Sequence, residues 1–275
     1  TVRRKWRELC ELWPLRLGAI YVVLHVVVLA WQWQGVVSAA VGLLIDIRFV
    51  VFFMVMYAAL RLHPMWRRPL LIGSMAAAMV SLGFAVLQVT VLPHDILTHI
   101  GYDKDTTTAP YLTVDQNYDF VRINGTLRGP NPLGAYAAII GSLVAALLLM
   151  VQRERLRAVS RYAPALLWVT LVCALVALWY SYSRSALVAG VGALGFVVGA
   201  YGVRRAPRAT FAAAGVMLMA LTLALVVFWQ TAFVQNVILH TNPEGGSSVG
   251  SNDEHVASLE TGWTRLLKQP LGAGI

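Results

Sequence analysis

Seven long apolar runs alternate with polar segments and account for most of the chain. They cover about residues 17–33, 36–60, 69–92, 133–151, 163–180, 186–203 and 209–228. Most are close to the roughly 20 residues that an α-helix needs to cross the hydrocarbon core of a bilayer. The pattern predicts an all-α integral membrane protein with seven transmembrane helices, organised as a single polytopic domain over residues 1–275.

Charged residues divide between the two ends of these helices. The N-terminal flank and the segments after the second, fourth and sixth runs hold most of the 22 lysines and arginines. Most of the 13 acidic residues lie in two longer polar stretches, 93–132 and 229–275. Because loops rich in Lys and Arg stay in the cytoplasm, we expect a cytoplasmic N-terminus and extracytoplasmic loops after the third and seventh helices.

Composition agrees with membrane insertion and changes the meaning of the net charge. Hydrophobic residues make up 58% of the chain, charged residues make up 13%, and the mean hydropathy is +0.66. A charge of +9 would suggest a nucleic-acid partner in a soluble protein. Here the basic residues instead follow the orientation pattern of a membrane protein. We therefore expect the lipid bilayer as a partner and no nucleic acid.

Basic residues outside this pattern carry the functional hypothesis. They are Arg48 within the second run, and Lys104, Arg122, Arg128, Arg184, Arg265 and Lys268 in the predicted outer segments. Insertion disfavours an arginine on the outer side of the membrane. Such an arginine is either retained for function or reaches for lipid headgroups.

The polar, glycine-rich segment from Arg122 to Asn131 is the strongest candidate for a binding site. Arg122 and Arg128 flank Asn124-Gly125, a dipeptide that favours a turn, and the segment leads directly into the fourth helix. Guanidinium groups bind phosphate oxygens in pairs, and a helix start adds backbone donors. The segment predicts a phosphate site, with Asn131 lining an adjoining cavity. The alternative is an ordinary loop with interfacial arginines.

Three further charged residues lie within or next to the apolar runs. Arg184 occupies the short turn before the sixth helix, where it would converge with Arg122 on a phosphate or contact lipid headgroups. Asp46 and Arg48 lie in the second helix, two residues apart and therefore on different faces. They would line a cavity or substrate pathway, or else pair with a residue of another helix.

Metal chemistry has little support in the sequence. The six histidines show no pair with ligand spacing inside a predicted helix. Asp103 and Asp105 resemble an acidic metal-binding pair, but the chain lacks the nucleotide-binding α/β domain that such a pair needs. His255 opens an amphipathic stretch through Leu259, and a surface histidine is the simpler interpretation. We expect no metal site and no cofactor.

Three short motifs together resemble the O-antigen ligase and O-antigen polymerase superfamily of bacterial membrane glycosyltransferases. The first is Arg122-x-x-Gly-Thr-Leu-x-x-x-Asn131-x-Leu-Gly-Ala, and the second is Ser183-Arg184-Ser185-Ala. The third runs from His255-x-x-Ser to Gln269-Pro-Leu-Gly-Ala-Gly-Ile275. They stand in the order found in the family, and they fit its topology. Each motif alone is weak evidence, but their combination is fairly specific.

The resemblance implies a GT-C-type fold and a transfer reaction at the outer face of the bacterial inner membrane. The donor would be a glycan on an undecaprenyl-diphosphate carrier, and the acceptor would be a saccharide hydroxyl, on a lipid or on another carrier-linked chain. Arginines matched by Arg122 and Arg184 would hold the diphosphate, without a metal or other cofactor. The family's catalytic histidine follows the Pro-Leu-Gly-x-Gly segment, so we expect an incomplete chain whose general base lies beyond Ile275, with His255 a weak candidate.

Two other functions remain open on the sequence. Asp46 and Arg48 within the membrane would suit a transporter or flippase for an anionic lipid-linked molecule or small solute. Such a protein would move its substrate without changing it covalently. A membrane scaffold without catalytic activity is the third possibility, and the absence of a lipid-linked ligand at the outer arginines would favour it.

Overall fold

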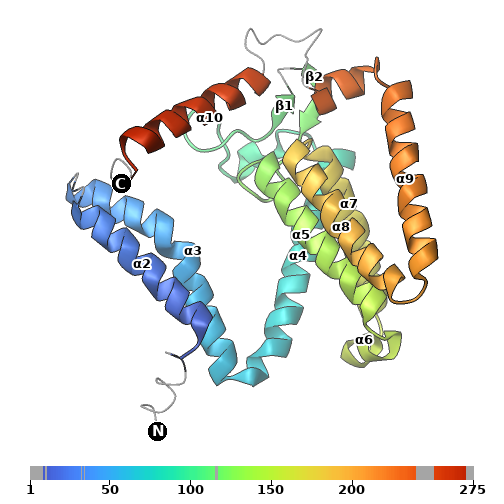
Figure 1. The fold of residues 1–275 in the computed structure, drawn as a ribbon, viewed down its shortest axis with the longest axis horizontal. Coiled ribbons are helices and arrows are strands. Elements are labelled where there is room, and N and C mark those ends of the chain that lie inside the picture. The colour runs from blue at the N-terminus through green and yellow to red at the C-terminus, as the bar shows by residue number, and fades with distance from the viewer. Residues whose placement is uncertain are drawn as a thin grey trace. The chain divides into compact units, whose positions relative to one another are not determined.

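A computed structural model of the protein describes residues 9, 11–31, 33, 35–114, 117–239 and 251–270 (Figure 1). Residues 1–8 of the basic flank, most of the glycine- and serine-rich segment 244–252 and the motif residues 271–275 lie outside the described part. The chain divides into two compact units, Thr1–Ser74 with His255–Ile275, and Met75–Glu254. Each unit is described below by itself.

The prediction of seven long apolar helices is confirmed. They are α2 (Trp13–Trp31), α3 (Val36–Leu62), α4 (Arg67–Thr90), α5 (Pro130–Met150), α7 (Ala163–Tyr180), α8 (Arg184–Val203) and α9 (Pro207–Val227). Each is long and apolar enough to cross a membrane, as expected for a multi-pass membrane protein. Several begin a few residues before the predicted starts, because proline suits a first helical turn, as at Pro130 and Pro207.

In the first unit, α2 and α3 pack against each other, and a short 3₁₀ helix, Pro64–Trp66, leads from α3 into α4. The two helices approach closely at Gly18, where an added Cβ would lie 2.6 Å from the Sδ of Met54. The unit also contains most of α10 (Ser251–Lys268), an amphipathic helix whose Leu259 and Trp263 are exposed. The predicted outer loop 229–275 is therefore partly helical.

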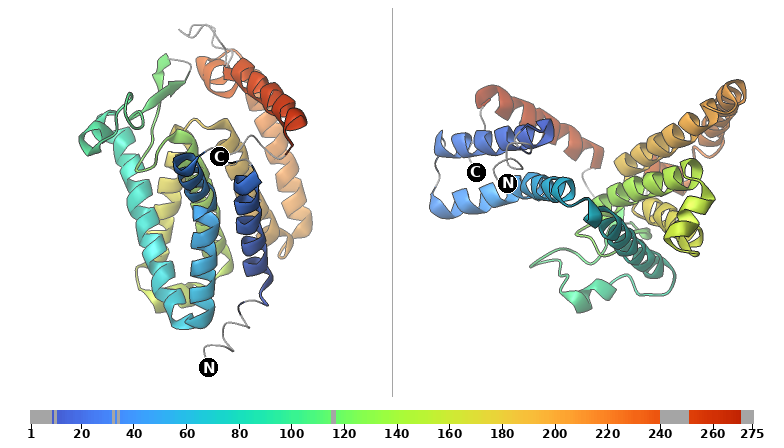
Figure 2. Two further views of the ribbon diagram at one scale, coloured as in Figure 1. Left: turned by 90° about the vertical axis from the view of Figure 1, so that its left-hand side faces the viewer. Right: turned by 90° about the horizontal axis from the view of Figure 1, so that it is seen from below.

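In the second unit, α5 packs against both α7 and α8 (Figure 2). Small and branched side chains fill the contact, among them the fully buried Leu133, Val144 and Ala177. A short helix α6 (Arg153–Val159) joins α5 to α7, and α9 contacts α8 while none of its own residues is buried. This three-helix core fixes one end of α5 beside the turn between α7 and α8.

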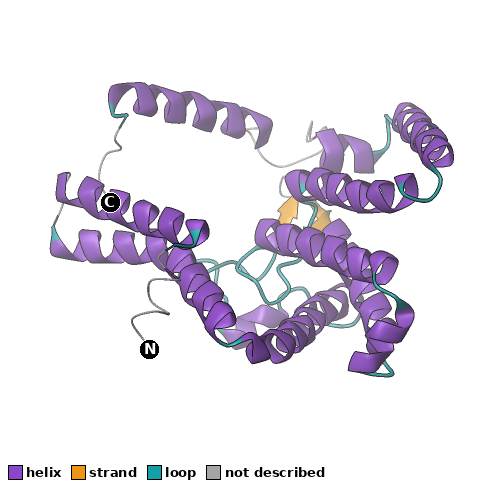
Figure 3. Cartoon of the chain, turned by 60° about the horizontal axis from the view of Figure 1, so that its bottom comes forward, coloured by secondary structure: helices purple, strands orange, loops and turns teal. Residues whose placement is uncertain are grey.

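The polar stretch 93–132 contains regular structure that an all-α prediction does not include. A 3₁₀ helix, Ile96–Ile100, is followed by an antiparallel pair of strands, β1 (Leu112–Val114) and β2 (Asn117–Arg122). Leu112 is paired with Arg122, and the register shifts after Thr113. Figure 3 shows this hairpin in orange among the helices. The hairpin matters for function because β2 ends at the candidate arginine.

Candidate functional site

Arg122 joins three parts of the chain that are far apart in sequence. Its Nε donates a hydrogen bond of 3.0 Å to the carbonyl oxygen of Ser181, in the turn between α7 and α8. Its Nη2 donates to Oδ1 of Asn131, in the first turn of α5, over 2.6 Å. The next residue, Ile123, donates its backbone N–H to the carbonyl oxygen of Tyr180 over 3.3 Å. The guanidinium is therefore held in place from both sides.

The turn after Arg122 is anchored by a buried side chain of α4. Gly125 has a φ of 57°, a left-handed conformation that glycine adopts without strain. Its N–H donates to Oε1 of Gln88 over 3.0 Å, and Nε2 of Gln88 donates to the carbonyl oxygen of His94 over 3.2 Å. Gln88 is 0% exposed. Its amide thus ties both ends of the polar stretch to one helix.

Asn124 and Gly125 form a turn, as predicted, although Asn124-Gly125-Thr126 also has the sequence of a glycosylation site. The backbone N–H of Leu127 donates to the carbonyl oxygen of Asn124, which closes the turn. The Asn124 side chain is fully buried, and its Nδ2 donates to the carbonyl oxygens of Ala109 and Pro110. A buried amide that holds the loop together is not accessible for modification.

Arg184 and Arg128 occupy different environments. Arg184 is half-buried and begins α8, three residues after Ser181, whose carbonyl holds Arg122. Ser183 is at the N-cap position, but its hydroxyl lies 3.4 Å from that of Ser185 and caps no backbone N–H. Arg128 is exposed, and it makes no hydrogen bond or ion pair with the described residues. Of the predicted phosphate ligands, Arg122 therefore contacts the turn that leads into Arg184, and Arg128 makes no hydrogen bond to this turn.

A groove of about 490 Å³ runs between α5 and α8 from this end of the unit. Its polar end is formed by Asn131 and Ser185, and its walls are mostly alanine, including Ala138 and Ala189. From Asn131 to Ser142, which also lines it, α5 rises roughly 16 Å. The groove therefore has a polar end beside Arg122 and a small-residue, largely apolar body.

A second space, which the sequence did not reveal, lies beside the same strand and turn. This aromatic cavity, of about 140 Å³, is lined by Val89, His94, Tyr118, Asp119, Val121, Ile123, Tyr180 and Tyr182. A wider pocket of about 390 Å³ adjoins it and shares His94, Tyr118 and Val121. The sequence contains one indication of this cavity. Tyr180 and Tyr182 flank Ser181 in the short turn before Arg184, close to a residue already predicted to be functional.

Tyr182 is held in an unusual backbone conformation. Its φ of 45° is the one left-handed value among the described residues other than glycine. Such a conformation costs about 1–3 kcal/mol and persists where the surrounding structure imposes it, often at functional sites. Its ring packs edge-on against Phe120 and beside Phe233 and Tyr180. Burial raises the pKa of the Tyr182 phenol, and Tyr180 adds a smaller rise, so the hydroxyl remains protonated at neutral pH.

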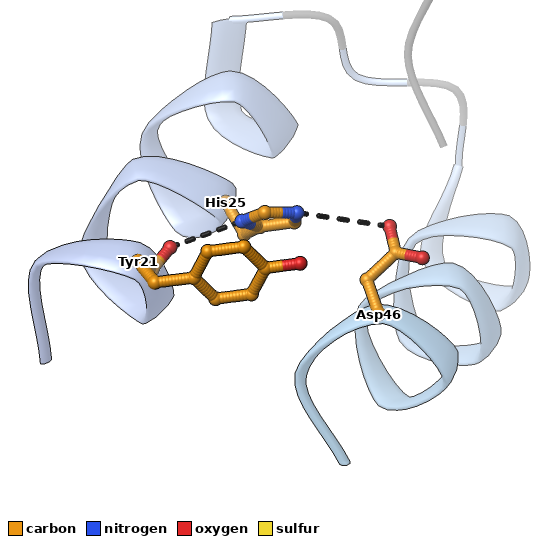
Figure 4. A network of polar contacts seen from close by, with 3 residues as sticks. All are labelled: Tyr21, His25 and Asp46. Carbon is orange, nitrogen blue, oxygen red and sulfur yellow. Dashed lines mark hydrogen bonds and ion pairs between the residues drawn. The ribbon is translucent and has the colours of Figure 1, made fainter. Parts of the chain in front are cut away.

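Asp46 has a partner that the sequence did not identify. His25 of α2 places its Nε2 4.0 Å from Oδ2 of Asp46 in α3 (Figure 4). The other ring nitrogen, Nδ1, lies 3.0 Å from the carbonyl oxygen of Tyr21, and Nε2 faces the carboxylate. The Tyr21 ring lies next to the imidazole, with ring centroids 4.2 Å apart and ring planes tilted by 35°. Asp46 therefore has an interhelical contact in the apolar part of the hairpin.

Arg48 does not share this contact. Its guanidinium lies 4.7 Å from the centroid of the Phe49 ring and is exposed, in agreement with the expectation that Asp46 and Arg48 point to different faces of the helix. Spacing along the sequence could not reveal the His25–Asp46 contact, because it depends on the register between two helices. Arg48 lies on a helix face that includes exposed apolar residues such as Phe52.

The His25–Asp46 pair predicts a measurable energetic coupling between α2 and α3. We expect the double variant His25→Gln/Asp46→Asn to lose less unfolding free energy than the sum of the losses in the two single variants. The coupling should be about 0.5–2 kcal/mol, the range of polar contacts between membrane helices. A double-mutant cycle on unfolding in mixed micelles measures it, with His63→Gln and Asp46→Asn as the control pair. Additive effects for His25 and Asp46 would contradict the pairing.

No metal centre is found among the described residues. Within the described part, no group of three or more His, Cys, Asp or Glu side chains could hold a metal ion. Asp103 instead accepts the backbone N–H of Asp105 over 2.7 Å in a local turn. His255 lies in α10, and its side chain is outside the described part, so the structure does not bear on its candidacy as a base.

Two arginines and a largely apolar groove lie close to the same turn of the second unit. Arg122 and Arg184 supply cationic charge at the α7–α8 turn, and the groove between α5 and α8 opens beside Asn131. One fold can serve many functions, so the function depends on the residues and geometry of the site. Comparison of the chain with protein-family models, with curated proteins and with solved structures finds no match.

Proposed function

We propose that this protein transfers a glycan from an undecaprenyl-diphosphate carrier to a saccharide acceptor at the extracytoplasmic face of the bacterial inner membrane. The observation that carries the proposal is the contact of Arg122 with Asn131, at the polar end of the groove between α5 and α8. Arg184 lies on the same turn that orients Arg122. The motif resemblance to O-antigen ligases and polymerases supports the same assignment.

The carrier lipid matches this site in its chemistry, and its charged and apolar parts follow one another as the arginines and the groove do. Its diphosphate is a compact double anion, which guanidinium groups bind with paired, charge-assisted hydrogen bonds. Its isoprenoid chain is apolar and would lie along the groove, where small side chains allow a close approach. At the outer end of a membrane helix, interactions between charges are also stronger than in bulk water.

The same arrangement suits the departure of the diphosphate. In the transfer, the acceptor hydroxyl oxygen bonds to the anomeric carbon, and the bond from that carbon to the diphosphate oxygen breaks. The diphosphate leaves with the electron pair, and Arg122 and Arg184 would stabilise the charge that develops on it. The hydroxyl proton passes to a general base. We assign no described residue to that role.

Binding of undecaprenyl diphosphate tests the proposal without knowledge of the glycan. In the full protein reconstituted in nanodiscs, we expect Arg122→Gln and Arg184→Gln each to weaken binding about tenfold to a hundredfold, because each removes charge-assisted hydrogen bonds of about 1.5–3 kcal/mol. The measurement is equilibrium binding of the radiolabelled lipid. Arg208→Gln, at the opposite end of the bundle in the first turn of α9, should leave binding unchanged. Unchanged binding in both outer variants would refute the assignment.

A transporter for an anionic lipid or solute is the second candidate, and the His25–Asp46 contact favours it. Ionisable side chains within the apolar part of a membrane protein often mark a substrate or proton pathway. The two functions differ in their products. A glycosyltransferase releases undecaprenyl diphosphate and forms a new glycosidic bond, whereas a transporter moves its substrate across liposomes unchanged.

A further inference from the structure

We infer that the aromatic cavity is a saccharide subsite that holds the sugar attached directly to the carrier diphosphate. The inference rests on the proposed function, because it places the sugar next to a diphosphate at Arg122. It identifies a specificity site that is separate from the arginines. The cavity contains rings, a carboxylate and an imidazole, the groups that recognise a polyhydroxylated ring.

The cavity and the arginine site share two walls. Arg122, the last residue of β2, donates to Ser181 and Asn131, while its neighbours Val121 and Ile123 line the cavity. The α7–α8 turn also contributes to both sites. The carbonyl oxygen of Ser181 accepts the Arg122 hydrogen bond, and the adjacent Tyr180 and Tyr182 line the cavity. In the donor, the anomeric carbon is bonded to a phosphate oxygen. The first sugar must therefore lie directly beside the phosphate site.

The lining has the chemistry that sugars require. Tyrosine rings offer apolar faces for the C–H groups of a sugar ring, and each carries a hydroxyl that can hydrogen-bond. The carboxylate of Asp119 can accept charge-assisted hydrogen bonds from sugar hydroxyls. Asp119 is exposed, and Tyr118 is 74% exposed, so both are accessible to a ligand. Small-molecule sites measure roughly 300–1,000 Å³. The aromatic cavity of about 140 Å³ reaches this range together with the adjoining pocket of about 390 Å³, so the sugar would extend from the cavity into that pocket.

The left-handed backbone of Tyr182 is an independent observation that points to the same place. A non-glycine residue in this conformation is uncommon, and ligand sites are among the places where it persists. Here it follows Ser181 and puts the Tyr182 ring against Phe120 and into the cavity lining. A phenol is protonated at neutral pH and can donate a hydrogen bond, and burial raises the pKa of Tyr182 further above this range.

Paired binding measurements separate the sugar site from the diphosphate site. In nanodiscs, the probes are undecaprenyl diphosphate and the same lipid bearing one hexose or one N-acetylhexosamine, each tested separately. We expect the wild-type protein to bind at least one sugar-bearing lipid more tightly than the bare lipid. Tyr118→Ala and Asp119→Asn should reduce that preference about fivefold or more, while their affinity for the bare lipid stays within about twofold.

Matched variants make the result specific. Tyr162→Ala, at another exposed tyrosine, and Asp105→Asn, in the same polar loop, should keep the wild-type preference. Arg122→Gln should weaken binding of every lipid and leave their ratio unchanged. Because Tyr118 and Asp119 are exposed, their variants should fold, and an unfolding midpoint like that of the wild type verifies this.

The possible outcomes separate the two proposals. If the wild type binds the bare lipid but prefers none of the sugar-bearing lipids, the saccharide subsite is refuted and the diphosphate site stands. An unchanged preference in both cavity variants refutes the subsite in the same way. If the wild type binds none of these lipids, the proposed function itself fails, and the inference fails with it.

Discussion

Gly134→Val is expected to destabilise the second unit by about 3 kcal/mol, at the upper end of the usual cost of overpacking. Gly134 lies in α5 where that helix meets the α7–α8 turn. Even a single Cβ there would be 2.6 Å from Oγ of Ser181 and 2.8 Å from Cβ of Ala186. The Ser181 hydroxyl is engaged with the carbonyl oxygen of Leu178, and the Ala186 Cβ is rigid, so α8 would have to move.

Thermal unfolding in detergent, followed by fluorescence-detected gel filtration, measures this effect. Gly195→Val is the matched control, because a Cβ at Gly195 in α8 would have nothing within 4 Å in the structure. We expect the control to unfold like the wild type or at a slightly higher temperature, since valine forms helices more readily than glycine. The Gly134 variant should also lose lipid binding, because Asn131 in the same helix moves with it. An unfolding midpoint like that of the wild type would contradict the close approach.

Gln88→Leu is expected to cost about 1–3 kcal/mol, because it leaves the buried N–H of Gly125 without a partner. His94 is exposed, so its carbonyl oxygen can accept a hydrogen bond from water instead. The leucine would fill the space of Gln88, but it cannot accept the N–H of Gly125 or donate to the carbonyl oxygen of His94. Added apolar contact offsets only part of this loss. The effect should be concentrated in the turn that follows Arg122.

Hydrogen exchange distinguishes this local effect from general unfolding. In Gln88→Leu, amide exchange should rise first in peptides that cover residues 123–127, while α5 and α7 stay protected. Gln152→Leu makes the same chemical change at an exposed position and should alter stability by less than about 0.5 kcal/mol. Equal protection of residues 123–127 in the wild type and the Gln88 variant would show that the side chain does not anchor the turn.

The sequence was sufficient to predict the helices, because their signal is local. Each of the seven apolar runs corresponds to a helix, and the boundaries differ by only a few residues. The hairpin was missed, although β2 contains an alternation of aromatic and other residues around Asp119. Short strands in a polar loop carry too little of this pattern to stand out from irregular backbone.

The candidate site was only partly predictable, for a different reason. Arg122 and Arg184 stood out because charge on the outer side of a membrane is unusual. The partners that position them depend on contacts between distant segments, such as Ser181 with Arg122, or Gln88 with Gly125. In the sequence, Gln88 is only one polar residue in an apolar run, which is weak evidence for a function. Its role as an anchor depends on its contact with the turn at Gly125.

The acceptor for Nε of Arg122 is a main-chain oxygen, and this bears on how the site can vary in evolution. A carbonyl is present whatever side chain occupies position 181, so that contact imposes no residue type on its partner. Asn131, in contrast, accepts through its side chain, and a change there alters the contact. Sequence covariation could therefore link positions 122 and 131 but would not detect the direct hydrogen bond between 122 and 181.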